Sequence, residues 1–326
     1  MECFDNMQRV SQQRAQHGYR LVRARASMIL VVLLIACMAA CSTMPVVTIP
    51  SENANSRVNH LVLHFTSENF QESLAILTGR TDRKVSSHYL IPSPSDESYG
   101  QAKLKVYSLV PTEQRAWHAG RSFWAGKRDL NDQSVGVEIV NLAGCAEDIS
   151  KLGNGPEFVV ACSFEPFPEE QISLLIRLLH SVLENYPDIP PESIVGHADI
   201  TPSRKVDPGP LFPWEQLYKA GIGAWFDNDR AAQIASLITR RPLSITLQQQ
   251  LLAAYGYEVE ATGVEDEQSQ LAVRAFQMHF RPSNYSGRFD VETSARLISL
   301  LERYRPRRLQ AFAELSESLV ALRPLL

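Results

Sequence analysis

The sequence predicts an α/β fold, with a mixed central sheet flanked by helices and followed by a small three-helix domain. Between residues 58 and 225, short apolar runs alternate with helical patterns, which is typical of a sheet covered by helices. After Trp225 the composition changes, and three short helical patterns follow one another. The chain has 326 residues, more than one ordinary domain, so two domains with extensions are expected.

In the first domain, apolar runs indicate strands, and apolar residues three or four positions apart indicate helices. The segment from Pro168 to Asn185 has a strong amphipathic pattern and is expected to be a long helix. One strand run contains a carboxylate, Glu138. The expected strands are 61–65, 85–91, 105–110, 134–140 and 194–195, and a shorter helix is expected at 69–77.

The second domain is expected to be helical and separate from the first. Glycine and proline residues separate its three amphipathic segments, which marks them as short helices. We expect a linker at 226–240, the helical domain at 241–305, with helices at 245–255, 265–280 and 290–302, and a C-terminal tail at 306–326 that could continue as a helix.

The first 41 residues resemble an export signal. Arginines precede a short apolar run that ends in small residues before cysteine, which is the order of a signal peptide. The run is shorter than the ~20 residues needed to span a bilayer. A bacterial lipoprotein signal is therefore favoured over an uncleaved anchor helix. Cys37 and Cys41 both remain candidates for lipidation.

The residues after the signal indicate the cellular location of the protein. Residues 42–57 are rich in Pro, Ser, Thr and Asn and are expected to be a tether. Neither candidate cysteine is followed by aspartate, which resembles the sorting pattern of outer-membrane lipoproteins. We therefore expect a lipid-anchored protein on the outer membrane that faces the periplasm.

Charge and cysteine content fit an exported protein. The formal net charge is −4, which does not indicate a nucleic-acid partner. Cys145 and Cys162 flank a glycine-rich segment of the mature chain. A disulfide between them suits an oxidising compartment, but two free thiols remain equally open. A monomer is expected.

A loop rich in proline and glycine, Ser193–Pro210, contains the first indication of chemistry. It holds His197 and Asp207, which are residue types that bind zinc. His64, at the end of an apolar strand, supplies a third ligand. Such a site keeps a net positive charge and leaves one position for a water whose pKa falls towards ~7. The sequence therefore predicts a catalytic Zn²⁺ site.

Two further charged residues could carry the chemistry of this site. Glu138 lies between apolar neighbours on a strand, where an inward carboxylate without a partner is costly. If it faces the cleft, it can act as the general base; otherwise it is a solvated surface residue. Lys205 lies two residues before Asp207 and could stabilise an oxyanion. Its alternative is a solvated loop lysine.

The sequence contains the motifs Val62–Thr66, Val85–Leu90, Ala116–Gly120, Leu130–Glu138 and Gly196–Trp214. Together these motifs resemble the zinc-dependent N-acetylmuramoyl-L-alanine amidases of the type-2 amidase family. The resemblance implies zinc ligands at His64, His197 and Asp207, a general base at Glu138 and a transition-state lysine at Lys205. It also implies hydrolysis of the amide between N-acetylmuramic acid, including its 1,6-anhydro form, and L-alanine in cell-wall turnover or recycling.

Other residues in these motifs have open roles. Trp117 and His118 could form a wall of the substrate cleft, and His88 could be either a wall or a structural residue. The helical domain resembles a peptidoglycan-binding module, although a structural appendage is also open. The implied partner is peptidoglycan or a muropeptide. A non-catalytic peptidoglycan-recognition protein is the alternative to an enzyme, but no catalytic position is missing.

Overall fold

The computed structural model describes residues 44, 46–146, 161–312, 314–315 and 317. The chain divides into two compact units, Met1–Ala54 and Asn55–Leu326. The described part of the first unit has neither helix nor strand, and its apolar side chains are exposed. The expected signal peptide, with Cys37 and Cys41, lies outside the described residues. Among the helices that are described, none has the length and apolarity to cross a membrane.

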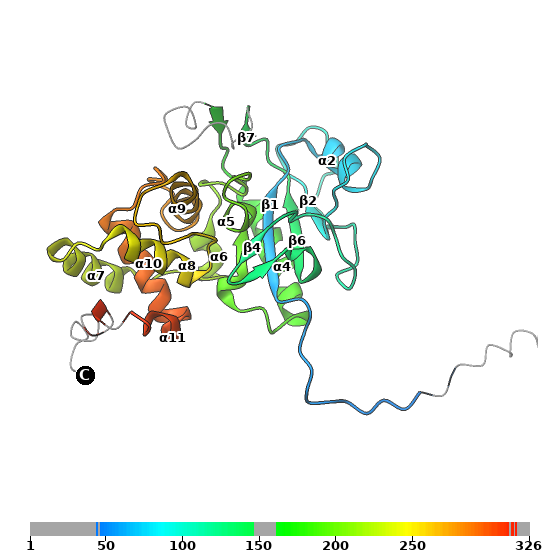
Figure 1. The fold of residues 1–326 in the computed structure, drawn as a ribbon. Coiled ribbons are helices and arrows are strands. Elements are labelled where there is room, and N and C mark those ends of the chain that lie inside the picture. The colour runs from blue at the N-terminus through cyan, green and yellow to red at the C-terminus, as the bar shows by residue number, and fades with distance from the viewer. Residues whose placement is uncertain (1–43, 45, 147–160, 313, 316, 318–326) are drawn as a thin grey trace, which may run out of the picture. The chain divides into compact units, whose positions relative to one another are not determined.

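A five-stranded mixed sheet forms the centre of the first domain (Figure 1). The strand order is β3-β2-β6-β1-β9. β1 pairs in parallel with β6 and β9, β2 pairs in parallel with β6, and β3 alone is antiparallel. The strands are β1 (His60–Phe65), β2 (Tyr89–Ile91), β3 (Tyr107–Ser108), β6 (Ser134–Ile139) and β9 (Ile194–Gly196).

Packing on both faces explains why the central strands are apolar. Consecutive residues of β1, Leu61, Val62 and Leu63, are all fully buried, as expected for a parallel strand covered on both sides. Helix α4 (Glu169–Asn185) packs against β2 through its apolar stripe. Helix α2 (Phe70–Leu77) begins at the N-cap Asn69, whose side chain accepts a hydrogen bond from the Glu72 amide.

Some strands are shorter than expected, and two small pairs were not foreseen. The segment 85–88 does not continue β2, because the Ser86 amide donates to the Trp117 carbonyl at 3.1 Å instead of to a strand. The hairpin of β4 (Phe123–Trp124) and β5 (Lys127–Arg128) stands apart from the main sheet. β7 (Gly144–Cys145) pairs with β8 (Cys162–Ser163), and a disulfide joins Cys145 to Cys162.

The segment 226–240, where a linker was expected, contains a helix. Asp227 caps its N-terminus by accepting from the Arg230 amide, and the helix packs against α10. Its buried residues, Ala231, Ile234 and Ile238, recur at helical spacing. The helices of this region are α7 (Asn228–Arg240), α8 (Ile245–Tyr255), α9 (Glu267–Phe280), α10 (Val291–Tyr304) and α11 (Pro306–Leu309); most of the tail beyond 309 is outside the described residues.

The helical region is not a separate body, contrary to expectation. One continuous apolar core includes side chains of both domains. Trp124 of the β4–β5 hairpin packs edge-on against Tyr255 and Tyr257, with ring centroids 5.9 and 4.9 Å away. The Ala125 amide donates to the Gly256 carbonyl at 2.8 Å. Buried aromatic contact of this kind fixes the two domains together.

Burial of His60 on β1 makes stability depend on pH. Burial, opposed by a hydrogen bond with the Gln133 backbone, lowers the pKa of His60 to about 4. The unfolded chain, whose histidines have a pKa near ~6.5, therefore binds a proton first as the pH falls. The free energy of unfolding should decrease from about pH 6.5 to pH 4, by at most about 3 kcal/mol from this group.

We expect His60→Leu to lose this part of the acid slope, measured by urea unfolding between pH 7 and pH 4 with chelator present throughout. Exposed His180 on α4 supplies the control His180→Gln, which should keep the slope of the parent. An unchanged acid slope in His60→Leu would show that His60 is not a source of the pH dependence.

Candidate functional site

The sheet brings three chemically active residues to one edge. His64 and Glu138 are each the second-last residue of their strands and lie opposite one another in the β1–β6 register. His197 directly follows β9 and begins the one-turn helix α5 (His197–Ile200), where a loop was expected. Since β1, β6 and β9 are parallel, their carboxyl ends meet, which is where α/β sheets place their ligand sites.

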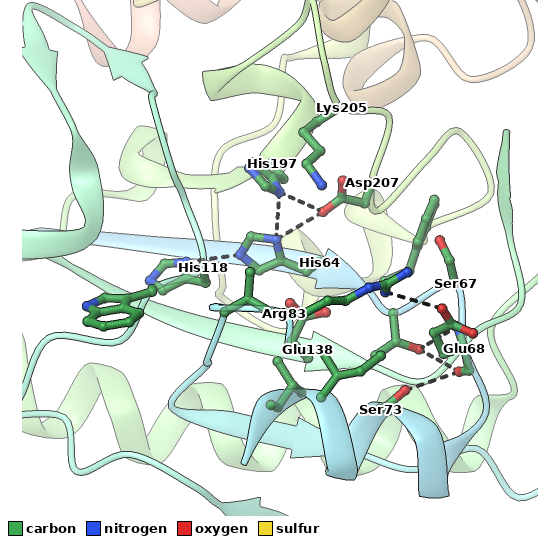
Figure 2. Close-up of a pocket in the computed structure, with 16 residues that line it drawn as sticks. His64, Ser67, Glu68, Ser73, Arg83, His118, Glu138, His197, Lys205 and Asp207 are labelled. Atoms are coloured by element: carbon green, nitrogen blue, oxygen red, sulfur yellow. Dashed lines mark hydrogen bonds and ion pairs between the residues drawn. The ribbon is translucent and has the colours of Figure 1, made fainter. Parts of the chain in front are cut away.

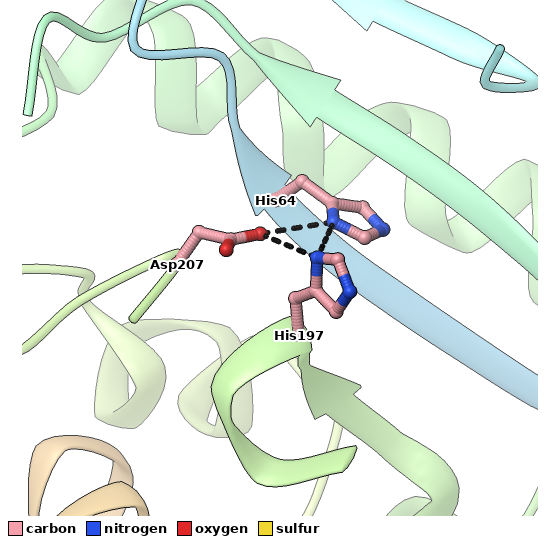
Figure 3. A group of neighbouring side chains, drawn as sticks. All are labelled: His64, His197 and Asp207. Carbon is pink, nitrogen blue, oxygen red and sulfur yellow. Dashed lines mark hydrogen bonds and ion pairs between the residues drawn. The ribbon is translucent and has the colours of Figure 1, made fainter. Parts of the chain in front are cut away.

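His64, His197 and Asp207 converge on a single buried point (Figure 3). The Asp207 Oδ2 lies 2.9 Å from His64 Nδ1 and 3.1 Å from His197 Nδ1, and the two Nδ1 atoms are 3.0 Å apart. Around a zinc ion with bonds of about 2.0–2.1 Å, tetrahedral ligand atoms are separated by roughly 3.3 Å. The three atoms therefore need to move apart by only a few tenths of an ångström to hold such an ion.

The Nε2 atoms of both imidazoles have hydrogen-bond partners, and these leave the Nδ1 atoms free to bind a metal. His197 Nε2 lies 3.3 Å from the Ala119 carbonyl, which can only accept. The proton of His197 therefore resides on Nε2, and its Nδ1 offers a lone pair. His64 Nε2 lies 3.0 Å from His118 Nδ1, so the same tautomer of His64 completes a hydrogen bond. Partners of this kind orient the metal-binding histidines of proteins.

Protonation states also suit a metal site. Burial, reinforced by the neighbouring His197, lowers the pKa of His64 to about 4, so this ring is neutral at pH 7. Burial opposes the ionisation of Asp207, but its close contacts with His197 and then with His64 hold the pKa of Asp207 well below its usual value. A neutral imidazole and an ionised carboxylate are the forms that bind zinc.

Glu138 and Lys205 line the same cavity as these three side chains (Figure 2). The cavity has a volume of about 450 Å³. Burial of Glu138, together with the negative charge of Asp207, raises the pKa of this carboxyl to about 8, while Lys205 opposes the rise. Because Glu138 lines this cavity, its carboxyl can exchange a proton there near neutral pH.

The three residues considered for the substrate wall have different positions. Trp117 is 52% exposed and lines the cavity. His88 is fully buried and does not line it, so of its two open interpretations the structure supports the structural one. Instead, His88 Nδ1 accepts from the Gly136 amide and His88 Nε2 lies 3.1 Å from the Gln114 carbonyl. These bonds tie β6 to the segment that precedes the Trp117 motif.

His118 reaches the cavity but has a role that sequence reasoning missed. It is buried beneath His64, and its Nε2 lies 3.3 Å from Ser134 Oγ, which donates to the Leu130 carbonyl. The ring fills the space beside Gly136, where a Cβ atom would lie 2.4 Å from it. A glycine in the middle of an apolar strand was the sequence signal, because it marks close approach of another group.

Similar proteins of known function identify the family of this chain. Residues 54–210 match the family described as N-acetylmuramoyl-L-alanine amidase. The amidase AmiD of Escherichia coli strain K12 is 42% identical over 255 residues, which cover 78% of this chain and 86% of that protein. This chain belongs to the N-acetylmuramoyl-L-alanine amidase family. The resemblance predicted from the sequence motifs is therefore confirmed.

Solved structures of amidases in this family support the fold. AmpDH3 of Pseudomonas aeruginosa, 39% identical, superposes with a TM-score of 0.72 over 80% of this chain and 99% of that one. E. coli AmiD, in complex with the substrate anhydro-N-acetylmuramic acid-L-Ala-D-γ-Glu-L-Lys, gives 40% identity and a TM-score of 0.67, covering 78% and 93% of the two chains. Residues 240–297 match a family of peptidoglycan-binding domains. The mixed sheet with a helical C-terminal domain is confirmed.

The hydrogen bond from His64 to His118 should be required for tight metal binding. His118→Phe keeps a ring in the buried space but removes the acceptor for His64 Nε2–H, so the affinity for zinc should fall by about 10–100-fold. Competition with a chromogenic chelator measures this affinity. His88→Phe also removes buried hydrogen bonds without touching a ligand, so it serves as the control and should retain zinc. Equal zinc affinity in His118→Phe and the parent would contradict the prediction.

Proposed function

We propose that this chain is a zinc-dependent N-acetylmuramoyl-L-alanine amidase that cleaves the amide between N-acetylmuramic acid, including its 1,6-anhydro form, and L-alanine. One observation carries the proposal. The lone pairs of two histidines and the carboxylate of Asp207 converge on one point of a cavity that Glu138 and Lys205 also line. The complexes of AmiD and AmpDH3 with anhydromuramyl peptides support the choice of substrate.

The donor set fits zinc as the metal. Two neutral imidazoles and one carboxylate are a common protein ligand set for a catalytic zinc ion, with a fourth position left for water or substrate. His64, His197 and Asp207 would hold the ion. When bound, it supplies Lewis-acid polarisation of the scissile carbonyl and a lowered pKa for the attacking water.

Glu138 moves the proton in this scheme. Its carboxylate accepts a proton from the attacking water, the carbon–nitrogen bond of the substrate breaks, and Glu138 returns the proton to the leaving amine of L-alanine. Burial raises the pKa of the Glu138 carboxyl to about 8, and a bound cation nearby would lower that pKa towards neutrality. The same carboxyl can therefore both accept and donate at pH 7.

Lys205 is suited to the charge that develops on the carbonyl oxygen. It lines the cavity with Asp207 and is half-buried, so its ammonium can stabilise an oxyanion better than a fully solvated group. A non-catalytic recognition protein would not need this set. The presence of three ligands, a base and a cation in one cavity favours the enzyme.

We also propose that the mature protein is an outer-membrane lipoprotein that faces the periplasm and acts in cell-wall turnover or recycling. The basic and apolar N-terminal pattern and its candidate cysteines support export and lipidation. The Cys145–Cys162 disulfide suits an oxidising compartment. The helical domain would hold the enzyme on peptidoglycan, and the protein would act as a monomer.

Glu138→Gln should bind zinc as tightly as the parent but lose hydrolysis by about 10²–10⁴-fold, because its amide cannot accept the proton. Mass spectrometry of muropeptides would measure release of stem peptides beginning at L-alanine, and competition with a chelator would measure zinc. Chelation should abolish the activity of the parent, and added zinc should restore it. A fully active Glu138→Gln protein would remove Glu138 from its assigned role.

The two candidate lipidation sites can be separated by substitution. We expect that only one of Cys37→Ser and Cys41→Ser abolishes incorporation of labelled palmitate and releases the protein from the membrane fraction, because only one cysteine becomes the N-terminus after cleavage. The other variant serves as the control. Membrane association of the double variant would contradict a lipid anchor.

A further inference from the structure

A buried hydrogen-bond network joins the helical domain to the segment that carries His197. Its centre is Asp199 of α5, which is 2% exposed. The Oδ1 atom of Asp199 accepts from the Tyr257 hydroxyl at 2.5 Å, and its Oδ2 accepts from the Gly196 amide and from His279 Nδ1, each at 2.8 Å. Tyr257 and His279 belong to the helical domain, whereas Gly196 belongs to the catalytic one.

Packing fixes His279 in place. Its ring stacks on Trp214 of α6 (Trp214–Lys219), with centroids 3.7 Å apart and planes 16° apart, and on Phe280 at 3.9 Å. Its Nε2 atom is buried and has no hydrogen-bond partner among the described residues. The bond to Asp199 is therefore the ring's only polar contact in the described structure, and a buried imidazole donor gains most from such a partner.

Helix α5 needs external support because it has only four residues. A single helical turn is not stable alone in water. Asp199 holds its first turn through the Gly196 amide, and the Ala198 amide donates to the Asp207 carbonyl at 2.8 Å. Gly196 and Pro208 pack closely, because a Cβ atom on Gly196 would lie only 2.6 Å from Pro208 Cδ. The orientation of His197, the first residue of this turn, therefore depends on the Asp199 bond to Gly196 and on the contacts of Gly196 and Ala198 with the segment 207–208.

We propose that Asp199 is a positioning residue for the metal site, and that the helical domain supplies the two donors, His279 and Tyr257, that hold it. The helical domain then acts on the active site as well as on substrate capture, because loss of its donors loosens the turn that presents His197. This inference rests on the proposed metal site. Its specific consequence is weaker retention of zinc by variants that change no ligand and no cavity residue.

The test uses the full mature chain. His279→Phe keeps the stacked ring but removes the donor, and Tyr257→Phe removes only a hydroxyl. We expect the zinc dissociation constant, measured by chelator competition at pH 7.5, to rise about tenfold for His279→Phe and several-fold for Tyr257→Phe. At saturating zinc, kcat on a muropeptide should stay within about twofold of the parent. His279→Asn restores a donor at the position of Nδ1 and should recover part of the affinity.

Ser294→Ala is the matched control. Like Tyr257→Phe it removes one buried hydroxyl of the helical domain, whose Oγ donates to Gln248 Oε1 at 2.7 Å, but it has no contact with Asp199. It should lower the unfolding temperature to a similar degree and leave zinc affinity unchanged.

Three outcomes would overturn the proposal. Parent-like zinc affinity in both His279→Phe and Tyr257→Phe would refute it, and so would an equal loss of zinc from Ser294→Ala, which would reduce the effect to general destabilisation. Failure of the parent protein itself to bind zinc would instead refute the proposed metal site, and this inference with it.

Discussion

The requirement that two neutral imidazoles and one ionised carboxylate share a buried point governs the structure around the catalytic cavity. Lone pairs of three ligands repel one another unless a cation lies between them, so the surrounding protein must hold them in place. It does so through fixed hydrogen-bond acceptors for the Nε2 atoms: the Ala119 carbonyl for His197 and the His118 ring for His64. His118 is in turn held by Ser134 at the start of β6. The geometry of the three side chains thus depends on backbone and side chains two contacts away from the proposed metal site.

Parallel strands give this arrangement its precision. His64 and Glu138 are register partners on adjacent strands, so their separation is set by the sheet and not by loop conformation. His197 follows a third strand of the same direction. His64 and Glu138 therefore keep their relative positions as long as the β1–β6 pairing is intact. Only Asp207 and Lys205 come from irregular chain, and the rigidity of that segment depends on its neighbours.

The sequence predicted the mixed sheet, and it predicted that His64, His197, Asp207 and Glu138 belong to one site, because those residue types are rare at such positions. Histidine at the end of an apolar strand and glutamate within one are costly unless they have partners. It did not predict the role of His118, whose partner His64 lies 54 positions away in the chain. It also missed the docking of the helical domain, because a buried Trp124 or Tyr257 looks the same in sequence whether it packs within a domain or between two.

The buried contact between the domains also bears on how such a chain can diversify. A module joined by a linker can be replaced by another through recombination with little effect on its neighbour. Here the Trp124 side chain of the catalytic domain is covered by Tyr255 and Tyr257, so an exchanged module must bring a matching surface or leave this tryptophan exposed to solvent. Recombination at this boundary is therefore restricted to donors of the same architecture, and the two parts are expected to be inherited as one piece.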